Sequence, residues 1–343
     1  MRMFLAAAVA ALATLVAATG AHAASLTYIK DRNVWISNVD GSGAVQVTRD
    51  GTADEPYNSP TMSDDGTIAA VKGFFVHILR QNGQQVRTFI PQNLRGTTSG
   101  SHGLHFSPDG KKLVYAKVAL GSCIAADCKT RGVSAVMDLE GNLLGEEKEY
   151  TGGFPSWVTN DIVLSHGGYL YQNMLWHWRD GSFVNWFDDS DLVADGLSTD
   201  LGDGQLSDDH RSYVAIRGYG DTTAIATYRV NGDLSAPKPP LPTMLCVASG
   251  PVSSPTVSGD GSTAYWSEPD GVWSMPISAD CPNGALLIPG ASEPDWSAAA
   301  VNPGPKTTGT PVARKKTKTA KCKRLSGKRK RACLKRAGSG AAT

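Results

Sequence analysis

The sequence lacks the short motifs that mark many catalytic folds. It contains no Gly-x-Ser-x-Gly elbow, no His-Glu-x-x-His helix and no phosphate-binding loop, each of which places a nucleophile, a zinc ion or a phosphate by a defined local geometry. It also contains no Cys-x-x-Cys pair, which disfavours a dithiol redox centre and a structural zinc site. The sequence therefore offers no ready signature of an enzyme, and its function has to be sought in its architecture.

Long apolar runs are also missing beyond the N-terminus. Arg2 precedes an apolar run over residues 4–18, and Ala21-His22-Ala23 has the small residues of a secretory cleavage site. The run is shorter than the roughly 20 residues that a membrane-spanning helix needs, so we favour a cleaved signal over an anchor. The sequence predicts a signal peptide at residues 1–23, cleavage after Ala23 and a soluble periplasmic or extracellular protein.

A phrase of turn residues and strand residues recurs every 40 to 50 positions. Its clearest copy is Phe106-Ser107-Pro108-Asp109-Gly110, followed by the strand-like residues 112–116. Other copies lie at residues 59–66, 154–161, 204–209 and 254–261. Each unit reads as a strand, a tight turn and a second strand, and a third strand follows that ends in another turn. A period of this size is typical of a β-propeller with four-stranded blades.

The two ends of the repeat region complete one further blade. Residues 293–297 have only the first strand of a unit, whereas residues 26–29, 34–41 and 45–48 supply the other three. Joining them closes the ring and removes exposed sheet edges. We therefore predict an all-β fold, a six-bladed β-propeller over residues 24–302 with closure between N-terminal and C-terminal strands.

The recurring phrase resembles the repeat of TolB-type periplasmic propellers, a Pro-x-Trp-Ser-Pro-Asp-Gly-like turn followed by strands. The resemblance spans roughly residues 25 to 300 and implies the fold. One propeller shape serves binding scaffolds, lyases and peptidase gates, so the resemblance implies no single activity. Blade strands begin directly after the predicted signal, and an outer-membrane transport role is therefore not carried over.

Six cysteines in an exported chain are read first as disulfides, because that compartment is oxidising. Their spacing suggests the pairs Cys123 with Cys128, Cys246 with Cys281, and Cys322 with Cys333. Free thiols are the alternative.

Acidic residues are absent from residues 306–336, which carry fourteen Lys and Arg. Because the whole chain is +1, the residues before this segment sum to about −13. The segment is poor in apolar residues, and we predict that residues 303–343 form a disordered basic tail. Such a polycation attracts anionic polymers and surfaces, unless it is a solvated tail without a dedicated partner. The predicted polyanion-binding residues are Arg314, Lys315, Lys316, Lys321, Lys323, Arg324, Lys328, Arg329, Lys330 and Arg331.

The segments that lead into the innermost strands of a propeller surround one mouth of its channel, which is the default place for a ligand. The residues expected there are Glu55, Tyr57, Asn58, His102, His105, Phe154, Asp203, Glu293 and Asp295. The mouth is therefore expected to be acidic and to suit a cationic ligand, although single carboxylates could instead accept turn hydrogen bonds.

Two arrangements could hold a metal ion. His102 and His105, with His166 as a third ligand, could support metal chemistry only if their strand is irregular, because residues three apart face opposite sides of a regular strand. The acidic run 188–191 and the segment 199–204 could offer oxygen atoms to calcium, but neither has EF-hand spacing. We therefore assign no catalytic residue and no resident cofactor, and keep calcium or another divalent metal as an alternative.

From these features we favour a non-catalytic exported propeller that binds a protein or cell-envelope ligand at the channel mouth. A metal-assisted polysaccharide lyase or hydrolase is the alternative. An enzyme requires a clustered acid, base and metal or oxyanion group, which the sequence does not bring together.

Overall fold

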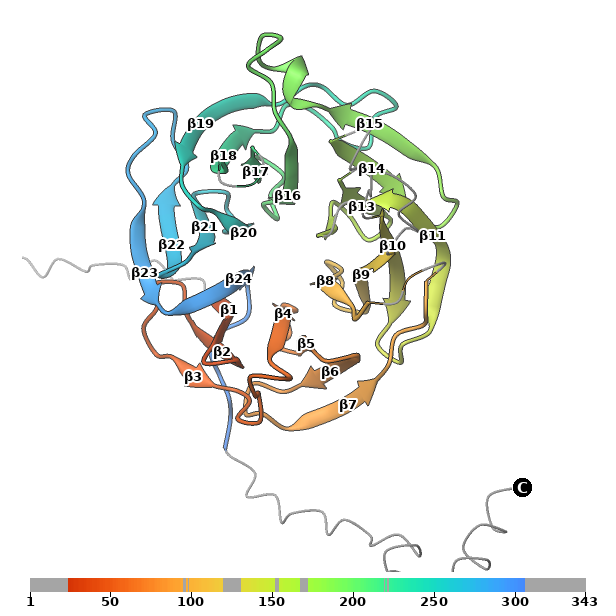
Figure 1. Ribbon diagram of the computed structural model, residues 1–343, viewed down its shortest axis with the longest axis vertical. Coiled ribbons are helices and arrows are strands. Elements are labelled where there is room, and N and C mark those ends of the chain that lie inside the picture. The colour runs from red at the N-terminus through yellow and green to blue at the C-terminus, as the bar shows by residue number, and fades with distance from the viewer. Residues whose placement is uncertain are drawn as a thin grey trace, which may run out of the picture. The chain divides into compact units, whose positions relative to one another are not determined.

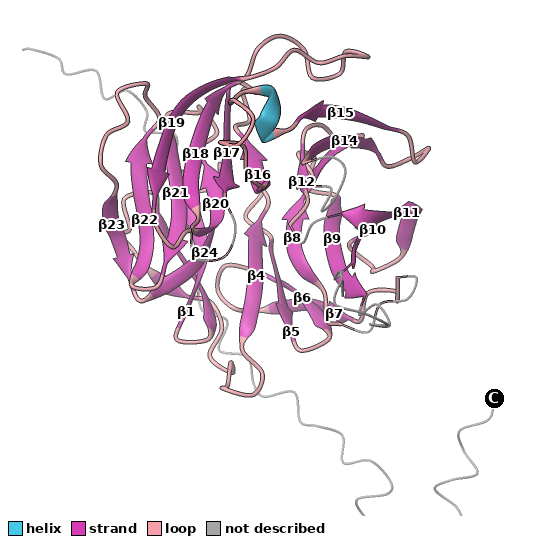
Figure 2. Ribbon diagram, turned by 45° about the horizontal axis from the view of Figure 1, so that its top comes forward, coloured by secondary structure: helices cyan, strands magenta, loops and turns pink. Residues whose placement is uncertain are grey.

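The structure, a computed structural model, describes residues 24–94, 97, 99–119, 131–151, 154–166, 172–218, 220 and 222–305. These residues form six antiparallel sheets of four strands arranged around a central channel (Figure 1). Apart from one turn of 3-10 helix at Asp189–Asp191, every regular element in the described ranges is a strand (Figure 2). The predicted all-β fold, the six blades and their four strands are confirmed.

Within each blade, the strands are given in order from the channel outward. The first blade consists of β4 (Tyr57–Met62), β5 (Ile68–Lys72), β6 (Phe75–Leu79) and β7 (Gln85–Phe89). The second consists of β8 (His102–Phe106), β9 (Lys112–Ala119), β10 (Arg131–Asp138) and β11 (Leu143–Thr151). The third consists of β12 (Ser156–Trp157), β13 (Ile162–Ser165), β14 (Asn173–His177) and β15 (Phe183–Phe187). The fourth consists of β16 (Leu201–Leu206), β17 (Ser212–Arg217), β18 (Ala224–Arg229) and β19 (Thr243–Ser249). The fifth consists of β20 (Ser253–Val257), β21 (Thr263–Glu268), β22 (Gly271–Pro276) and β23 (Ala285–Pro289). The sixth consists of β24 (Ala291–Ser297), β1 (Ser25–Lys30), β2 (Asn33–Asn38) and β3 (Val45–Gln46).

The sixth blade is assembled from both ends of the repeat region. Strand β24 pairs antiparallel with β1, with Leu26 opposite Trp296 and Thr27 opposite Asp295. This is the closure that the sequence predicts. Because β1 also pairs with β2, the N-terminal strand connects the last innermost strand to the rest of its sheet.

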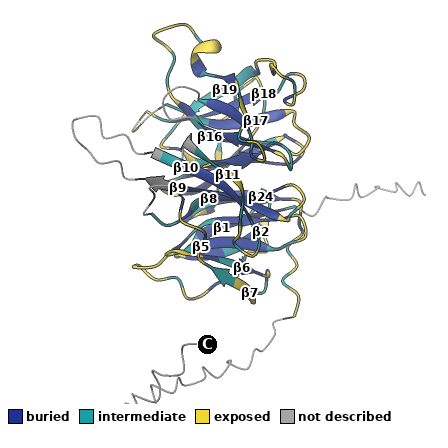
Figure 3. Ribbon diagram, turned by 90° about the vertical axis from the view of Figure 1, so that its right-hand side faces the viewer, coloured by how far each residue is buried: buried dark blue, intermediate teal, exposed yellow. Residues whose placement is uncertain are grey.

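The hydrophobic core is divided among the interfaces between adjacent blades. On β5, for example, Ala69 and Val71 pack toward the second blade, whereas Ile68 and Ala70 pack toward the sixth. Successive side chains of a strand point to opposite faces, and here both faces are covered. The inner strands are accordingly buried along most of their length, whereas exposed residues gather on turns and outer strands (Figure 3).

Five of the six innermost strands carry the same irregularity. Between Asn58 and Thr61, β4 holds one residue more than its partner β5, and β8, β16, β20 and β24 shift register at the equivalent position. Each bulge contains a residue with positive φ, namely Ser59, Gly103, Asp203, Ser254 and Glu293. A bulge redirects the side chains that follow it. Because the five bulges occupy equivalent positions, the five strands change direction at the same level of the channel.

Side chains at the bulges link neighbouring blades. The Ser59 N–H donates to the Glu293 carboxylate at 2.5 Å, and the Gly103 N–H donates to the Ser59 hydroxyl at 2.9 Å. Two residues beyond Glu293, the Asp295 carboxylate accepts from the Met62 N–H at 3.3 Å. These bonds run from one blade to the next around the channel, so the inner ring is stabilised by side chains as well as by sheets.

The predicted disulfide between Cys246 and Cys281 is present, with Cα atoms 5.0 Å apart. It joins β19 of the fourth blade to the turn before β23 of the fifth. The other two predicted pairs, Cys123 with Cys128 and Cys322 with Cys333, lie outside the described residues.

Replacing both Cys246 and Cys281 with alanine is expected to lower the free energy of unfolding by about 3 kcal/mol, because the bond closes a loop across 35 residues. Chemical unfolding of the oxidised protein and of the double variant measures this difference. A reducing agent should lower the free energy of unfolding of the parent protein by breaking the Cys246–Cys281 bond. It should have no such effect on the double variant, which lacks this bond. Equal stability of the two proteins under oxidising conditions would contradict a contribution from this bond.

Candidate functional site

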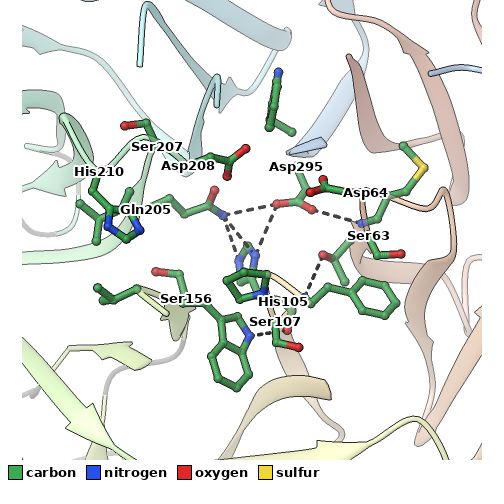
Figure 4. A pocket seen from close by; sticks show the side chains of 18 residues that line it. Ser63, Asp64, His105, Ser107, Ser156, Gln205, Ser207, Asp208, His210 and Asp295 are labelled. Carbon is green, nitrogen blue, oxygen red and sulfur yellow. Dashed lines mark hydrogen bonds and ion pairs between the residues drawn. The ribbon is translucent and has the colours of Figure 1, made fainter. Parts of the chain in front are cut away.

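The channel contains two cavities at different levels. The larger, of about 260 Å³, is lined by the last residues of the innermost strands and by the turns that follow them; we call it the turn-side cavity (Figure 4). The smaller, of about 40 Å³, is lined mainly by the bulge residues of the innermost strands; we call it the entry-side cavity. Both have His105, Gln205 and Asp295 in their walls, and we call these three residues the waist.

The waist is a continuous hydrogen-bonded network across the channel. Gln205 Oε1 accepts from the Thr256 hydroxyl at 2.7 Å, which leaves the Gln205 amide to donate to the His105 ring, at 3.0 Å from Nε2 and 3.4 Å from Nδ1. We assign the His105 proton to Nδ1 on this pattern, and Nδ1 then faces Asp295 Oδ1 at 3.4 Å. Figure 4 shows the three side chains in contact at the centre of the channel. Both ring nitrogens of His105 are therefore engaged within the protein.

The turn-side cavity is acidic. Carboxylates of Asp64, Asp208 and Asp295 line it together with the imidazoles of His105 and His210. Loss of bulk water around Asp208 raises the pKa of that carboxyl to about 6, and the nearby carboxylates of Asp64, Asp209 and Asp295 add to the effect. Negative charge is thus concentrated here without a matching set of cations among the lining residues.

The turns themselves use a different set of carboxylates. In the repeat Ser-x-Asp, the serine hydroxyl donates to the aspartate at 2.6 Å for Ser63 with Asp65 and for Ser207 with Asp209. The same aspartates accept backbone N–H groups two residues later, from Thr67 and Arg211. These aspartates hold the turns, whereas Asp64 and Asp208, at the variable position between serine and aspartate, face the cavity.

The entry-side cavity contains two carboxylates that have no cationic partner among the described residues. Burial raises the pKa of Asp203 to about 7. Burial also raises the pKa of Glu293, although the hydrogen bond from the Ser59 N–H acts in the opposite direction. Phe154 lines the same cavity. This end of the channel therefore combines protonatable acids with an aromatic side chain.

Replacing Asp203 with Asn is expected to stabilise the protein at high pH only. The folded protein holds a proton on Asp203 that the unfolded chain releases, so stability is lost as the pH rises from the ordinary value of 3.8 through about 7. An amide does not ionise, and Asn also tolerates the left-handed backbone of this residue. We expect a gain of about 1 to 2 kcal/mol at pH 8, reduced from the full shift by water in the channel, and almost none at pH 4.

Urea unfolding at pH 4 and pH 8 measures this effect. The matched control is Asp200→Asn, which removes an exposed carboxylate three residues earlier and should leave stability unchanged at both pH values. A gain for Asp203→Asn that is the same at pH 4 and pH 8 would rule out ionisation as its cause.

The structure brings five of the nine predicted mouth residues together at the channel. His105, Phe154, Asp203, Glu293 and Asp295 line the entry-side cavity. His102 packs edge-on against Phe154, with ring centroids 5.7 Å apart.

The other three predicted mouth residues lie elsewhere. The Tyr57 hydroxyl donates to Asp50 at 3.0 Å, and its ring packs against His77. Asn58 pairs with Val71 before the bulge, and Glu55 is exposed on the loop before β4. None of these three lines either cavity. They precede the bulge, which changes the direction of the strand before it reaches the channel.

The residues considered as alternative metal ligands have other partners. His166 Nε2 accepts the Gly204 N–H at 3.1 Å, and burial lowers the pKa of His166 to about 4. Within the described ranges, no three His, Cys, Asp or Glu side chains lie close enough to share a metal ion. In the acidic run 188–191, Asp189 is buried and binds the Arg217 guanidinium through two contacts of 2.8 Å. Asp189 therefore serves to hold the loop that contains residues 188–191 against Arg217.

Sequence reasoning missed Asp64, Asp208 and Trp296 as cavity residues. The first two occupy the position of the turn that also holds Pro108, Thr159 and Gly259 in other blades. A departure from a repeat at such a position is the only signal that the sequence carries for them.

The ten predicted polyanion-binding residues and the predicted signal peptide lie outside the described residues. No helix in the described part of the chain is long and apolar enough to cross a membrane.

The fold and the channel define a six-bladed β-propeller with an axial, acidic channel that is closed at a polar waist. No family model and no curated protein matches the chain. Among solved structures, TolB from Acinetobacter baumannii matches with a TM-score of 0.53 and 18% identity over 81% of this chain and 67% of that chain. A protein of unknown function from Bacteroides caccae matches with a TM-score of 0.50 and 10% identity, over 80% and 98%. A putative TolB from Agrobacterium tumefaciens gives 0.49 and 13%, over 81% and 92%.

The chain therefore has a TolB-like propeller fold, as the resemblance of its repeat implies. Likeness at this level of identity shows the fold and leaves the activity to be argued from the site.

Proposed function

We propose that the protein is an exported, non-catalytic propeller that binds a protein or cell-envelope ligand in its channel. In this proposal the ligand enters the turn-side cavity, the entry-side cavity or both, and the basic tail attracts the protein to anionic surfaces. The TolB-like fold supports a scaffold of this kind, and the two cavities supply concave, polar surfaces at the place where propellers bind ligands.

The waist is the observation on which this proposal depends. His105 and Asp295 have the pairing of a general base with its orienting carboxylate. However, Gln205 donates to His105 Nε2, which is the nitrogen that would have to accept a proton. The nearby Ser156 hydroxyl donates to the Gly204 carbonyl at 2.8 Å, so it is not directed at the imidazole. The polar groups at the centre of the channel thus bind one another, as expected of a rigid binding surface.

The alternative of a polysaccharide lyase or hydrolase gains no support from the described residues. His102, His105 and His166 bind separate partners, and neither cavity reaches the roughly 300 to 1,000 Å³ of pockets that enclose whole drug-sized ligands. A binding role for a protruding part of a larger partner fits these dimensions better.

Site-specific photo-crosslinking tests the channel as the binding site. A photoreactive residue at Pro108, which is exposed and lines the turn-side cavity, should crosslink a discrete envelope component in cells. The matched control is the same residue at Leu286, on the outermost strand of the fifth blade. Adducts from Leu286 but not from Pro108, or identical adducts from both, would contradict binding in the channel.

The tail is tested separately by sedimentation with purified cell envelope across a salt series. We propose that the polycation binds anionic surfaces because counterions are released when it does so. The full chain should sediment more strongly at low salt than a chain ending at Pro305, and this difference should disappear as the salt concentration rises. Equal retention of the two chains at low salt would refute an anchoring role for the tail.

A further inference from the structure

The turn-side cavity is too small to enclose a drug-sized ligand and large enough for one long side chain. Its volume of about 260 Å³ lies just below the range of pockets that enclose drug-sized molecules. If a partner binds in the channel, as proposed above, this cavity must therefore receive a protruding part of it. The chemistry of the wall decides which part.

Two groups of the wall meet beside Gly259. This glycine belongs to the turn after β20, Asp208 to the turn after β16, and Trp296 to β24. A Cβ atom at Gly259 would collide with both the Trp296 indole and the Asp208 carboxylate. The absence of a side chain at Gly259 thus allows an aromatic ring and a carboxylate from different blades to lie close together.

The Asp208 carboxylate is not used by the fold. It makes no hydrogen bond or ion pair with any described residue, whereas the adjacent Asp209 binds Ser207 and the Arg211 N–H. Asp64 and Asp295 line the same cavity and add negative charge on its other sides. In Figure 4 the carboxylates of Asp208 and Asp295 face the same open space above the waist.

We propose that the turn-side cavity binds the guanidinium group of an arginine side chain carried by a peptide or protein ligand. Asp208 is its carboxylate partner and the Trp296 indole is its aromatic wall. This inference rests on the proposed function and adds the chemical class of the group that is recognised.

Arginine fits this wall better than lysine does. Its guanidinium is planar, so it can stack on an indole while its N–H groups form paired hydrogen bonds with a carboxylate. It is also less strongly hydrated than an ammonium group and therefore loses less on entering a confined site. The waist closes the cavity at its far end with His105, Gln205 and Asp295, and no Lys or Arg is among the described residues that line the cavity.

Calorimetry with the full-length protein and three tripeptides tests the inference. Gly-Arg-Gly is the probe, Gly-Lys-Gly tests selectivity, and the citrulline analogue of Gly-Arg-Gly keeps the shape without the charge. We expect Gly-Arg-Gly to bind at least about tenfold more tightly than the citrulline peptide, as a charge-assisted hydrogen bond implies. Equal affinity for the arginine and citrulline peptides, or no detectable binding of either, would overturn the inference.

Three variants locate the site. Asp208→Asn should weaken Gly-Arg-Gly binding about tenfold, and Gly259→Ala should weaken it by filling the space between the two groups. Asp54→Asn removes an equal charge from an exposed loop before β4 and should change the affinity less than about twofold, because water and salt screen distant charges. An equal loss in Asp208→Asn and Asp54→Asn would show general attraction and contradict the proposed partner.

Acidification offers a second readout. Besides Asp64, Asp209 and Asp295, the imidazoles of His105 and His210 face Asp208 within the cavity or its turn. Asp208, whose pKa burial raises to about 6, gains a proton between pH 7.5 and pH 5, so the cavity becomes less negative and the affinity for Gly-Arg-Gly should fall. The fall should be smaller in Asp208→Asn, and an affinity that does not change with pH would count against the carboxylate.

Failure of this inference is distinguishable from failure of the proposed function. If Gly-Arg-Gly does not bind while Pro108 still crosslinks an envelope component, the channel is a binding site for another chemistry. If neither is observed, both proposals fail.

Discussion

A chain that lacks residues 24–48 is expected to lose cooperative unfolding of the propeller. Strands β1, β2 and β3 would be removed, and β24 would then have no partner within its sheet. The deletion would also expose the fifth-to-sixth-blade interface, in which Leu26 and Tyr28 are fully buried. Because a propeller depends on closure to cover its edges, we expect a molten or aggregated product, as judged by thermal unfolding and size-exclusion chromatography.

A chain ending at Pro305 is the control for this deletion. It removes more residues but leaves every described strand in place, so its melting temperature should match that of the full chain. A cooperative transition within a few degrees of the parent in the chain lacking residues 24–48 would show that closure is dispensable.

A point substitution tests the same closure if the deletion cannot be produced. Leu26→Ala should cost about 2 to 5 kcal/mol, because it empties a fully buried site beside Tyr28. Leu241→Ala, at a leucine that is 45% exposed, should change stability by less than about 0.5 kcal/mol. Equal effects of the two substitutions would contradict the packing at β1.

Arg217→Met is expected to lower the free energy of unfolding by about 3 to 5 kcal/mol. Its guanidinium makes two contacts of 2.8 Å with Asp189, whose side chain is completely buried. Removing the cation leaves a buried carboxylate without its partner, and that penalty is large. The pair also holds the loop before β16, since Arg217 donates to the Leu197 carbonyl and Asp189 accepts the Thr199 N–H.

Urea unfolding measures the loss, and an exposed ion pair provides the comparison. Arg179 contacts Asp161 at 2.6 Å, but both side chains are about 60% exposed, so Arg179→Ala should cost less than about 1 kcal/mol. If both substitutions have the same small effect, the Asp189 site does not behave as a buried ion pair.

The architecture could be predicted from the sequence because the same strand-and-turn pattern occurs several times along the chain. The phrases at residues 59–66, 106–110 and 254–261 share a turn that requires Gly or Asp at fixed places. The incomplete unit at residues 293–297 identified the closing strand, which pairs with β1. The Cys246–Cys281 bond followed from the export signal and spacing alone.

The bulges explain why the mouth was predicted only in part. Four of the five left-handed positions, at Ser59, Asp203, Ser254 and Glu293, carry residues that adopt this conformation less readily than glycine does. The sequence therefore gives no clear sign of a bulge in this segment, and Tyr57 is expected at the channel. In the structure the bulge separates Tyr57 from the cavity residues, and its hydroxyl binds Asp50 instead.

The turn-side cavity could not be predicted because its parts are close only in the closed ring. Asp208, Gly259 and Trp296 come from three blades, and no spacing along the chain relates them. The acidic run at residues 188–191 shows the same limit from the other side. Its spacing left calcium as an alternative, whereas the partner that neutralises Asp189 is Arg217, 28 residues away.

Hydrogen exchange of the full-length protein, with and without purified cell envelope, tests most directly whether the channel is the binding site. Binding in the channel predicts added protection in peptides that cover residues 59–65, 103–109, 203–210 and 293–298, which line the two cavities. It predicts no change in the outer strands β7, β15 and β23. Protection confined to those outer strands, with the channel peptides unchanged, would contradict the proposed function.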